Sequence, residues 1–229
     1  MNTQKNSQQN PEDRELVALF KGLDTPGVSD ALDKLGIPGQ CLGIMPLADY
    51  RGTVVGPAFT VKYVSCGQPA GTVGDFIDDV AQGDVIVIDN DGRSDCTAWG
   101  DIMTQYAGLR GIAATVIDGV CRDVAKALDD AYPMFTRGRF MRTGKDRVEV
   151  LAVNQPVAIG TARVVSRDIV VADANGVLVV PRARATEVAE VAQRIEAAES
   201  RIRELIAQGQ TLGEARAQLR YHRLQTRNA

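Results

Sequence analysis

Two continuous apolar runs mark the middle of the chain. Residues 83–90 (GDVIVIDN) and 112–118 (IAATVID) lack the alternation of a half-exposed strand, and turn residues border both runs. Such runs are typical of strands that are buried on both faces of a parallel sheet. Between them, residues 98–111 have a helical composition, and residues 124–131 begin another helix. The order strand, helix, strand, helix predicts a βαβ unit with parallel strands.

The segment before this unit predicts one strand and three short helices. Residues 52–64 are rich in β-branched and aromatic residues, which predicts a strand with a bend at Gly56-Pro57. The helices are expected at 13–21, at 25–36, where Thr25 or Ser29 is the expected N-cap and Gly36 the end, and at 72–81.

The pattern changes after residue 147. Short β-rich segments follow one another, and DANG at 173–176 has the residues of a turn between two of them. This half therefore predicts antiparallel or mixed strands. Residues 183–208 form a long helical stretch, and TLGE at 211–214 matches a capping box that opens a last helix.

These elements predict a single α/β domain with helical ends. Residues 1–12 are polar and are expected to form a disordered or frayed tail. The domain is expected to cover 13–210, with a C-terminal helical extension over 211–229. No internal repeat or low-complexity linker divides the chain, so one compact unit is the simplest interpretation.

Composition narrows the function classes without naming one. The 229 residues are 45% apolar and 24% charged, with a formal net charge of −3 and no basic block, so a nucleic-acid partner is not expected. The longest apolar runs fall far short of the roughly 20 residues that a membrane span needs. The polar N-terminus does not resemble a secretory signal. We therefore expect a cytoplasmic protein without a membrane partner.

The shortage of histidine restricts the possible metal chemistry. The chain has one histidine, His222, near its end, and four cysteines without a CxxC pair. A zinc site is therefore not expected, and any metal must be held mainly by oxygen atoms, which favours Mg²⁺, Mn²⁺ or Ca²⁺. The cysteines are expected to be small apolar filling residues, with a chemical role kept open only for Cys121 because it precedes Arg122.

Sheet topology should bring two distant charged pairs together. A right-handed βαβ unit returns its second strand beside the first, so the start of the helix and the end of the second strand lie at the same edge. Gly100-Asp101 and Arg122-Asp123 occupy these two places. Open α/β sheets bind ligands at this edge.

The chemistry of these residues suits an anion and a cation together. The first N–H groups of the helix, at Asp101, Ile102 and Met103, can bind a carboxylate, and Gly100 lets that ligand approach the backbone. Arg122 offers a bidentate contact to the same anion. Asp101 and Asp123 are hard ligands for a divalent cation, which can polarise the ketone of a 2-oxo acid. An ordinary helix cap and a surface ion pair remain the alternative interpretation.

Several motifs together resemble the RraA-like family. They are GDVIVID, AWGD at 98–101, DGVCRD at 118–123, VSDALDKLG, GPAFTV and VVADANGVLVVP, and the resemblance covers roughly residues 24–210. It implies an α/β/α sandwich related to phosphohistidine swivelling domains. It also implies a pyruvate aldolase of class II that uses Mg²⁺ or Mn²⁺ and cleaves 4-hydroxy-4-methyl-2-oxoglutarate or 4-carboxy-4-hydroxy-2-oxoadipate. Oxaloacetate decarboxylation as a side activity and a homotrimer or hexamer (dimer of trimers) are implied as well.

The same resemblance assigns roles to residues. It implies that Asp123 binds the metal directly and Asp101 through water, and that Arg122 binds the pyruvyl group and stabilises the enolate. The N–H groups of Ile102 and Met103 are expected to hold the pyruvate carboxylate. A glutamate of a neighbouring subunit is expected to support the metal through water. Glu199 is favoured for this role, and Glu196 is the alternative.

One departure from the family pattern and two alternative functions remain. Many relatives have a Pro-Gly-Asp turn where this chain has Ser166-Arg167-Asp168, outside the expected site. The first alternative function is a regulator that inhibits ribonuclease E by protein contact, since the namesake of the family is such an inhibitor and fold does not imply function. The second is a lyase that acts on another 2-oxo acid.

Overall fold

The two apolar runs form neighbouring parallel strands at the centre of the sheet. In the computed structural model, which describes residues 9–221, 224 and 226, β3 (Val85–Thr97) pairs in parallel with β4 (Ala114–Cys121). Helix α3 (Asp101–Arg110) connects them, and Gly111 ends it in the left-handed conformation. The predicted βαβ unit is thus confirmed, although β3 continues past residue 90 to Thr97.

The sheet is mixed, as the sequence predicts. Its order within the described residues is β1-β5-β4-β3-β2-β9-β10, with β6 paired to β2. β2 is parallel to β3 but antiparallel to β6 and β9, and β7 and β8 form a separate antiparallel pair. The bounds of these strands are β1 (Met45–Pro46), β2 (Val54–Ser65), β5 (Met134–Arg139), β6 (Val148–Val153), β7 (Val157–Ile159), β8 (Ala162–Val164), β9 (Ile169–Asp173) and β10 (Gly176–Val180).

Three apolar clusters define the layers. On one face of the parallel strands, Ile86 and Ile88 pack in a cluster with Ala107 of α3. On the other face, Val85 and Val87 belong to a cluster with residues of β7 to β10. The outer face of β9 and β10 packs against helices. Helices therefore cover both outer faces, as in the predicted α/β/α sandwich, and the sheet itself supplies two layers between them.

The ends of the helices test the capping residues that the sequence predicts. Gly36 ends α2 with φ 67°, as predicted, but Asp24 caps this helix through the N–H of Gly27, so the expected cap by Thr25 or Ser29 is wrong. The capping box between Thr211 and Glu214 is confirmed. The other helical bounds are α1 (Pro11–Leu19), α2 (Thr25–Leu35), η1 (Asp75–Asp79), α4 (Val124–Asp129), η2 (Arg182–Arg184), α5 (Ala185–Ala207) and α6 (Leu212–Gln218).

A buried ion cluster fixes α1 to the domain. Arg167 lies in the left-handed conformation (φ 73°) and its guanidinium binds both Asp84, at 2.6 Å, and Asp13 of α1. Burial raises the pKa of Asp84 although Arg167 opposes this shift. Because α1 begins at Pro11, the last two residues of the predicted 1–12 tail are helical, and residues 1–8 lie outside the described part.

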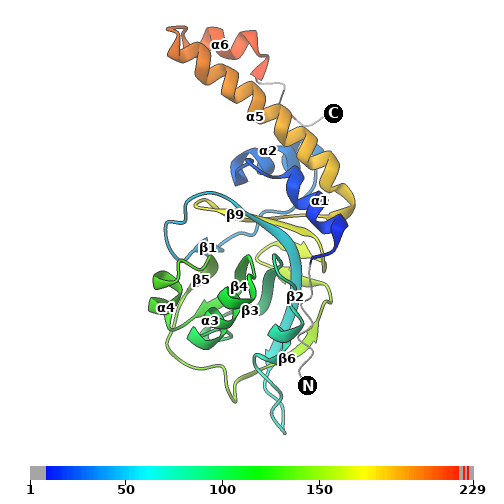
Figure 1. Cartoon of the computed structure of the whole chain (residues 1–229), viewed down its shortest axis with the longest axis vertical. Coiled ribbons are helices and arrows are strands. Elements are labelled where there is room, and N and C mark those ends of the chain that lie inside the picture. Colours follow the sequence, from blue (N-terminus) through cyan, green and yellow to red (C-terminus); the bar gives the residue numbers. More distant parts are fainter. Residues whose placement is uncertain (1–8, 222–223, 225, 227–229) are drawn as a thin grey trace.

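The long helix α5 projects from the body of the molecule. Figure 1 shows α1, α2 and α5 above β9, whereas α3 and α4 lie below β9, beside β3, β4 and β5, and α6 folds back at the tip of α5. Among the described helices, none is both long and apolar enough to cross a membrane.

Candidate functional site

Gly100-Asp101 and Arg122-Asp123 meet at one edge of the sheet. A Cβ atom placed on Gly100 would lie only 2.8 Å from Oδ2 of Asp123 and 3.4 Å from Nε of Arg122. The N–H of Arg122 donates to the carbonyl of Trp99 at 3.2 Å, which fixes the two chain segments together. The predicted proximity is confirmed, and glycine at position 100 is required by close approach rather than by its backbone angles, because its conformation is extended.

The backbone orients both carboxylates. Asp123 precedes α4 with φ 54° and ψ 40°, a left-handed conformation that aspartate adopts more readily than most residues. Its Oδ2 lies 3.2 Å from Nε of Arg122. Asp101 is exposed at the start of α3, and its Oδ1 accepts the N–H of Ile102 at 2.8 Å. A substrate carboxylate would therefore have to displace this bond to use the N–H of Ile102.

A cavity of about 270 Å³ opens beside Gly100, Asp101 and Arg122. Trp99 forms part of its lining from a buried position, where its Nε1 donates to Thr104 at 2.9 Å and its ring stacks on Tyr132. Trp99 is thus a packing residue. The described residues that line the cavity are Val73, Thr97, Ala98, Trp99, Gly100, Asp101, Ile102, Met103, Arg122, Thr143 and Gly144.

Sequence reasoning missed the part of this lining that comes from distant segments. Thr143 and Gly144 reach the cavity because the N–H of Thr97 donates to the carbonyl of Arg142 at 3.0 Å. A Cβ on Gly144 would lie 2.2 Å from the carbonyl oxygen of Thr97, so glycine is required there. Val73 comes from the loop after β2. Neither segment carries a motif that points to the sheet edge, and only their long-range contacts place them.

The donor set fits a divalent cation that keeps most of its ligands as water. The site offers two carboxylates, Asp101 and Asp123. Asp123 approaches Gly100 so closely that a side chain at position 100 would not fit. Mg²⁺ is typically held by one or two carboxylates plus water. Within the described residues, no group of three or more histidine, cysteine or acidic side chains is placed to hold a metal.

The two glutamates expected to support the metal lie on α5, away from this cavity within the same chain (Figure 1). Glu199 accepts the hydroxyl of Tyr221 at 2.8 Å and lies 3.6 Å from Arg203. Glu196 accepts Ser200 and also pairs with Arg203. The chain therefore does not bring either glutamate to its own Asp123, and only a neighbouring subunit could do so.

Three of the four cysteines are buried packing residues, and Cys66 is only partly buried. All four are free, and Cys41, Cys96 and Cys121 are buried. Burial raises the pKa of the Cys121 thiol, which disfavours the thiolate that a chemical role would need. His222 lies outside the described residues.

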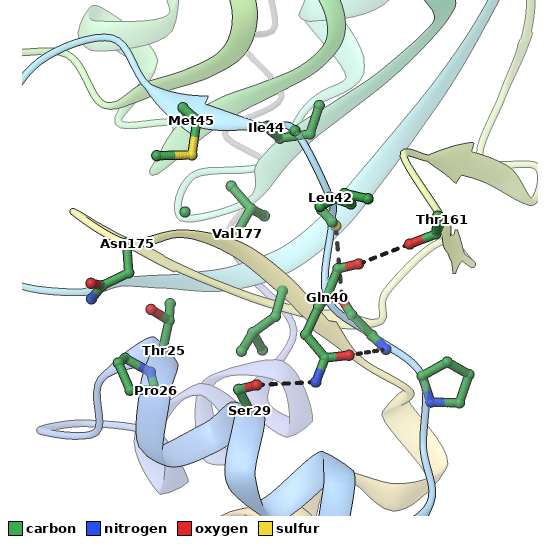
Figure 2. A pocket seen from close by; sticks show the side chains of 16 residues that line it. Thr25, Pro26, Ser29, Gln40, Leu42, Ile44, Met45, Thr161, Asn175 and Val177 are labelled. Atoms are coloured by element: carbon green, nitrogen blue, oxygen red, sulfur yellow. Dashed lines mark hydrogen bonds between the residues drawn. The ribbon is translucent and has the colours of Figure 1, made fainter.

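A second and larger cavity, about 560 Å³, lies between α2 and the loop before β1. Figure 2 shows Gln40 in the lining of this cavity. The side-chain amide of Gln40 donates to Ser29, and the backbone carbonyl of Gln40 accepts from the hydroxyl of Thr161. None of the described residues that line this cavity is charged. The smaller cavity has charged residues of both signs, Asp101 and Arg122, in its lining, and we therefore take it as the candidate functional site.

Comparison with known proteins identifies the family of this chain. The RraA-like family, described as aldolase/RraA, matches residues 25–179. Protein DlpA of Legionella pneumophila is 41% identical over 82% of this chain, but the match spans only 31% of DlpA. "Putative 4-hydroxy-4-methyl-2-oxoglutarate aldolase" of Halalkalibacterium halodurans is 35% identical over 80% of this chain and 84% of its own length.

The fold has a solved counterpart as well. The crystal structure of an uncharacterized protein from Pseudomonas syringae pv. tomato superposes with a TM-score of 0.83 at 42% identity, and the match covers 91% of this chain and all of the other. The family match includes α2, the whole βαβ unit and the strands up to β10. Because the family model matches residues 25–179 and the solved counterpart shares the fold, the chain belongs to the RraA-like family.

Proposed function

We propose that the protein is a divalent-metal-dependent pyruvate aldolase that cleaves 4-hydroxy-4-methyl-2-oxoglutarate or 4-carboxy-4-hydroxy-2-oxoadipate. The observation that carries this proposal is the close approach of Arg122 and Asp123 to Gly100, beside a cavity that Gly100, Asp101 and Arg122 line. The similarity to a relative named for the first of these substrates supports it. The products are pyruvate plus a second pyruvate or oxaloacetate.

The reaction defines what the site must do. The bond between C3 and C4 of the substrate breaks, and its electron pair remains on the pyruvyl fragment as an enolate. The C4 hydroxyl loses its proton as C4 becomes the ketone of the second product, and C3 of the enolate then takes up a proton. The site must therefore hold the 2-oxo acid, meet the enolate charge with positive charge, and move one proton.

The described residues match these three tasks. The guanidinium of Arg122 binds the pyruvyl oxygens and stabilises the enolate. The N–H groups of Ile102 and Met103, at the start of α3, hold the carboxylate. Asp101 exchanges the proton with the substrate hydroxyl through water, and its Oδ1 is freed when the substrate carboxylate takes the N–H of Ile102.

Asp123 would hold the Mg²⁺ or Mn²⁺ ion, with Asp101 acting through water. The ion supplies Lewis-acid polarisation of the 2-oxo group when bound. Asp123 is held in place by its left-handed backbone and by Arg122. Oxaloacetate has the same 2-oxo acid group and leaves the same enolate when it loses CO₂, so its decarboxylation is the expected side reaction.

We also propose that the protein forms a homotrimer or a dimer of trimers. The projecting helix α5 carries Glu199 away from the cavity of its own chain, which is consistent with a role at the site of a neighbour (Figure 1). The mass of the assembly in solution, measured by light scattering, tests this, and a monomer that is fully active would contradict it.

A pyruvate-release assay tests the proposed function. Purified protein with Mg²⁺ should cleave the two substrates and decarboxylate oxaloacetate, and EDTA should stop all three reactions. Arg122→Ala should lower kcat by about 10²–10³-fold, the cost of removing one donor that stabilises an oxyanion. The control is Asp130→Ala, which removes a carboxylate that pairs with Lys126 at the surface of α4 and should leave the rate unchanged.

The outcomes separate the competing functions. Turnover that is insensitive to EDTA, or an Arg122→Ala variant of full activity, would contradict the proposed mechanism. Capture of ribonuclease E by a protein without lyase activity would favour the regulator instead. Cleavage of a different 2-oxo acid with neither expected substrate turned over would favour the other lyase.

A further inference from the structure

We infer that the loop of residues 66–74 is a specificity element that favours a methyl group on the substrate carbon C4, and that Glu149 is its positioning residue. This inference rests on the proposed function. It predicts that 4-hydroxy-4-methyl-2-oxoglutarate is preferred over 4-carboxy-4-hydroxy-2-oxoadipate, which carries a charged carboxymethyl group at the same carbon.

The loop supplies an apolar wall to the cavity beside the charged edge. Val73 lines the cavity together with Met103 of α3, and both pack against the main apolar cluster of the domain. A Cβ on Gly74 would lie 3.3 Å from the sulfur of Met103, so the loop and the helix are in contact along this wall. The apolar wall, defined as Val73 and Met103, thus joins the loop after β2 to the start of α3.

A single carboxylate oxygen holds the loop in this position. Oε2 of Glu149, on β6, accepts the N–H of Gly71 at 2.7 Å and that of Gly67 at 3.2 Å. These two bonds hold the pKa of Glu149 below its usual range. A Cβ on Gly71 would lie 3.0 Å from this oxygen, so the loop approaches Glu149 as closely as glycine allows.

Two further hydrogen bonds connect β6 and β2 to the loop at Thr72 and Val73. The N–H of Val150, next to Glu149, donates to the carbonyl of Thr72 at 2.9 Å. The hydroxyl of the buried Tyr63 donates to the carbonyl of Val73. Val73 is therefore fixed from β6 on one side and from β2 on the other, and the loop is a built wall rather than a free lid.

Charge and size explain the selectivity. Among the described residues that line the cavity, Arg122 is the only cation, and the pyruvyl group and Asp123 already engage it. A second charged arm placed against Val73 and Met103 would lose water without gaining an ionic partner. A methyl group gains burial on the same surface, and one such group is worth about 10-fold or more in discrimination.

The decisive experiment compares the two substrates in three variants with bound Mg²⁺. Glu149→Ala removes the anchor and should raise KM for the 4-methyl substrate several-fold, with a smaller change in kcat. Glu149→Gln keeps one oxygen that can accept both N–H groups and should restore the wild-type KM. Val73→Ala widens the wall and should shift the ratio of kcat/KM by about 10-fold toward the 4-carboxymethyl substrate. In the two Glu149 variants, exchange of the methyl protons of pyruvate with solvent should stay unchanged, because pyruvate has no C4 substituent to place against the apolar wall.

Each result has one meaning. Wild-type protein that cleaves neither substrate would overturn the proposed function and this inference with it. Wild-type protein that cleaves both, with a substrate ratio that Val73→Ala and Glu149→Ala leave unchanged, would overturn the inference alone. A Glu149→Gln variant as impaired as Glu149→Ala would show that the charge of Glu149 acts directly and not through the loop.

Discussion

Two pairs of aspartates come from the same two strands, and they behave in opposite ways. Asp89 and Asp118 face each other in register on β3 and β4 and are 4% and 5% exposed. Asp101 and Asp123 follow the ends of the same strands, and the side chain of Asp123 is 40% exposed. The first pair lies inside the sheet, and the second lies at its edge.

Every carboxylate oxygen of the buried pair has at least one hydrogen-bond donor, and we call such a carboxylate saturated. Asp89 accepts Lys62 at 2.9 Å and the N–H of Ala158 at 3.1 Å. Asp118 accepts Arg137 and the N–H of Gly160, the latter at 2.6 Å. Four strands thus carry a row of charges in the order lysine, aspartate, aspartate, arginine, and the two carboxylates tie β7 and its following turn to the sheet.

The exposed pair keeps binding capacity. Asp101 accepts one N–H and Asp123 pairs with one arginine, so oxygen atoms of both remain available to solvent or a ligand. A carboxylate accepts about four hydrogen bonds when ionised. The aspartates within the two strands are saturated and hold the structure together, whereas the aspartates just beyond the strand ends keep oxygen atoms that can bind a ligand.

Removing a buried aspartate gives the largest expected effect on stability. Asp118→Ala leaves the guanidinium of Arg137 and the N–H of Gly160 without their partner, so the free energy of unfolding should fall by roughly 3 kcal/mol. Urea denaturation measures the change. Asp101→Ala is the matched control at the exposed edge and should stay within about 0.5 kcal/mol of wild type. Equal losses in the two variants would erase the distinction between the pairs.

Acid should weaken a third saturated carboxylate, Asp173 on β9. Its burial raises the pKa, but bonds from Thr25 and Asn175 outweigh this and leave the pKa below the ordinary value of 3.8. The sign follows directly: the stability that Asp173 adds is complete above pH 3.8 and is lost as the pH falls through the lower folded value.

Asp173→Asn should remove this acid-sensitive part, which is worth roughly 1–3 kcal/mol near neutral pH. Urea denaturation at pH 6 and at pH 3 compares the two proteins, and the gap between wild type and variant should narrow at the lower pH. If the difference in the free energy of unfolding were the same at both pH values, the charge of Asp173 would not contribute to stability.

The smallest expected change in the free energy of unfolding is an increase rather than a loss. Asp123→Gly relieves the left-handed backbone at position 123 and should stabilise the fold by up to about 1 kcal/mol while the lyase activity is lost. Thermal unfolding and the pyruvate-release assay measure the two changes on the same sample. A loss of both stability and activity would place Asp123 with the structural carboxylates after all.

The sequence predicts the central unit well because its signals are local. The apolar runs of β3 and β4, the glycine that ends α3 and the capping box at Thr211 all act within a few residues. The meeting of Asp101 with Arg122 follows from strand topology, so it is predictable too. The roles of these residues in catalysis come from the resemblance and stay predictions.

The remaining features depend on contacts that no local pattern encodes. Thr25 was expected to cap α2, but its N–H and hydroxyl bind Asp173, so its neighbour Asp24 takes the cap. The second sheet layer and the apolar wall at Val73 arise in the same way, from segments far apart in the chain. The Ser166-Arg167-Asp168 departure likewise has a partner far away, because Arg167 is held by Asp13 and Asp84.

The continuity of strand β2 has a consequence for how the protein unfolds. Its first residues, Val54 to Pro57, pair with β9 below the helices, and Ala58 to Lys62 pair with β3 beside the candidate site. No loop separates these two stretches, so one layer cannot open by a hinge while the other stays intact. The fold should therefore lose the site and the base of the projecting helix in a single cooperative unfolding step.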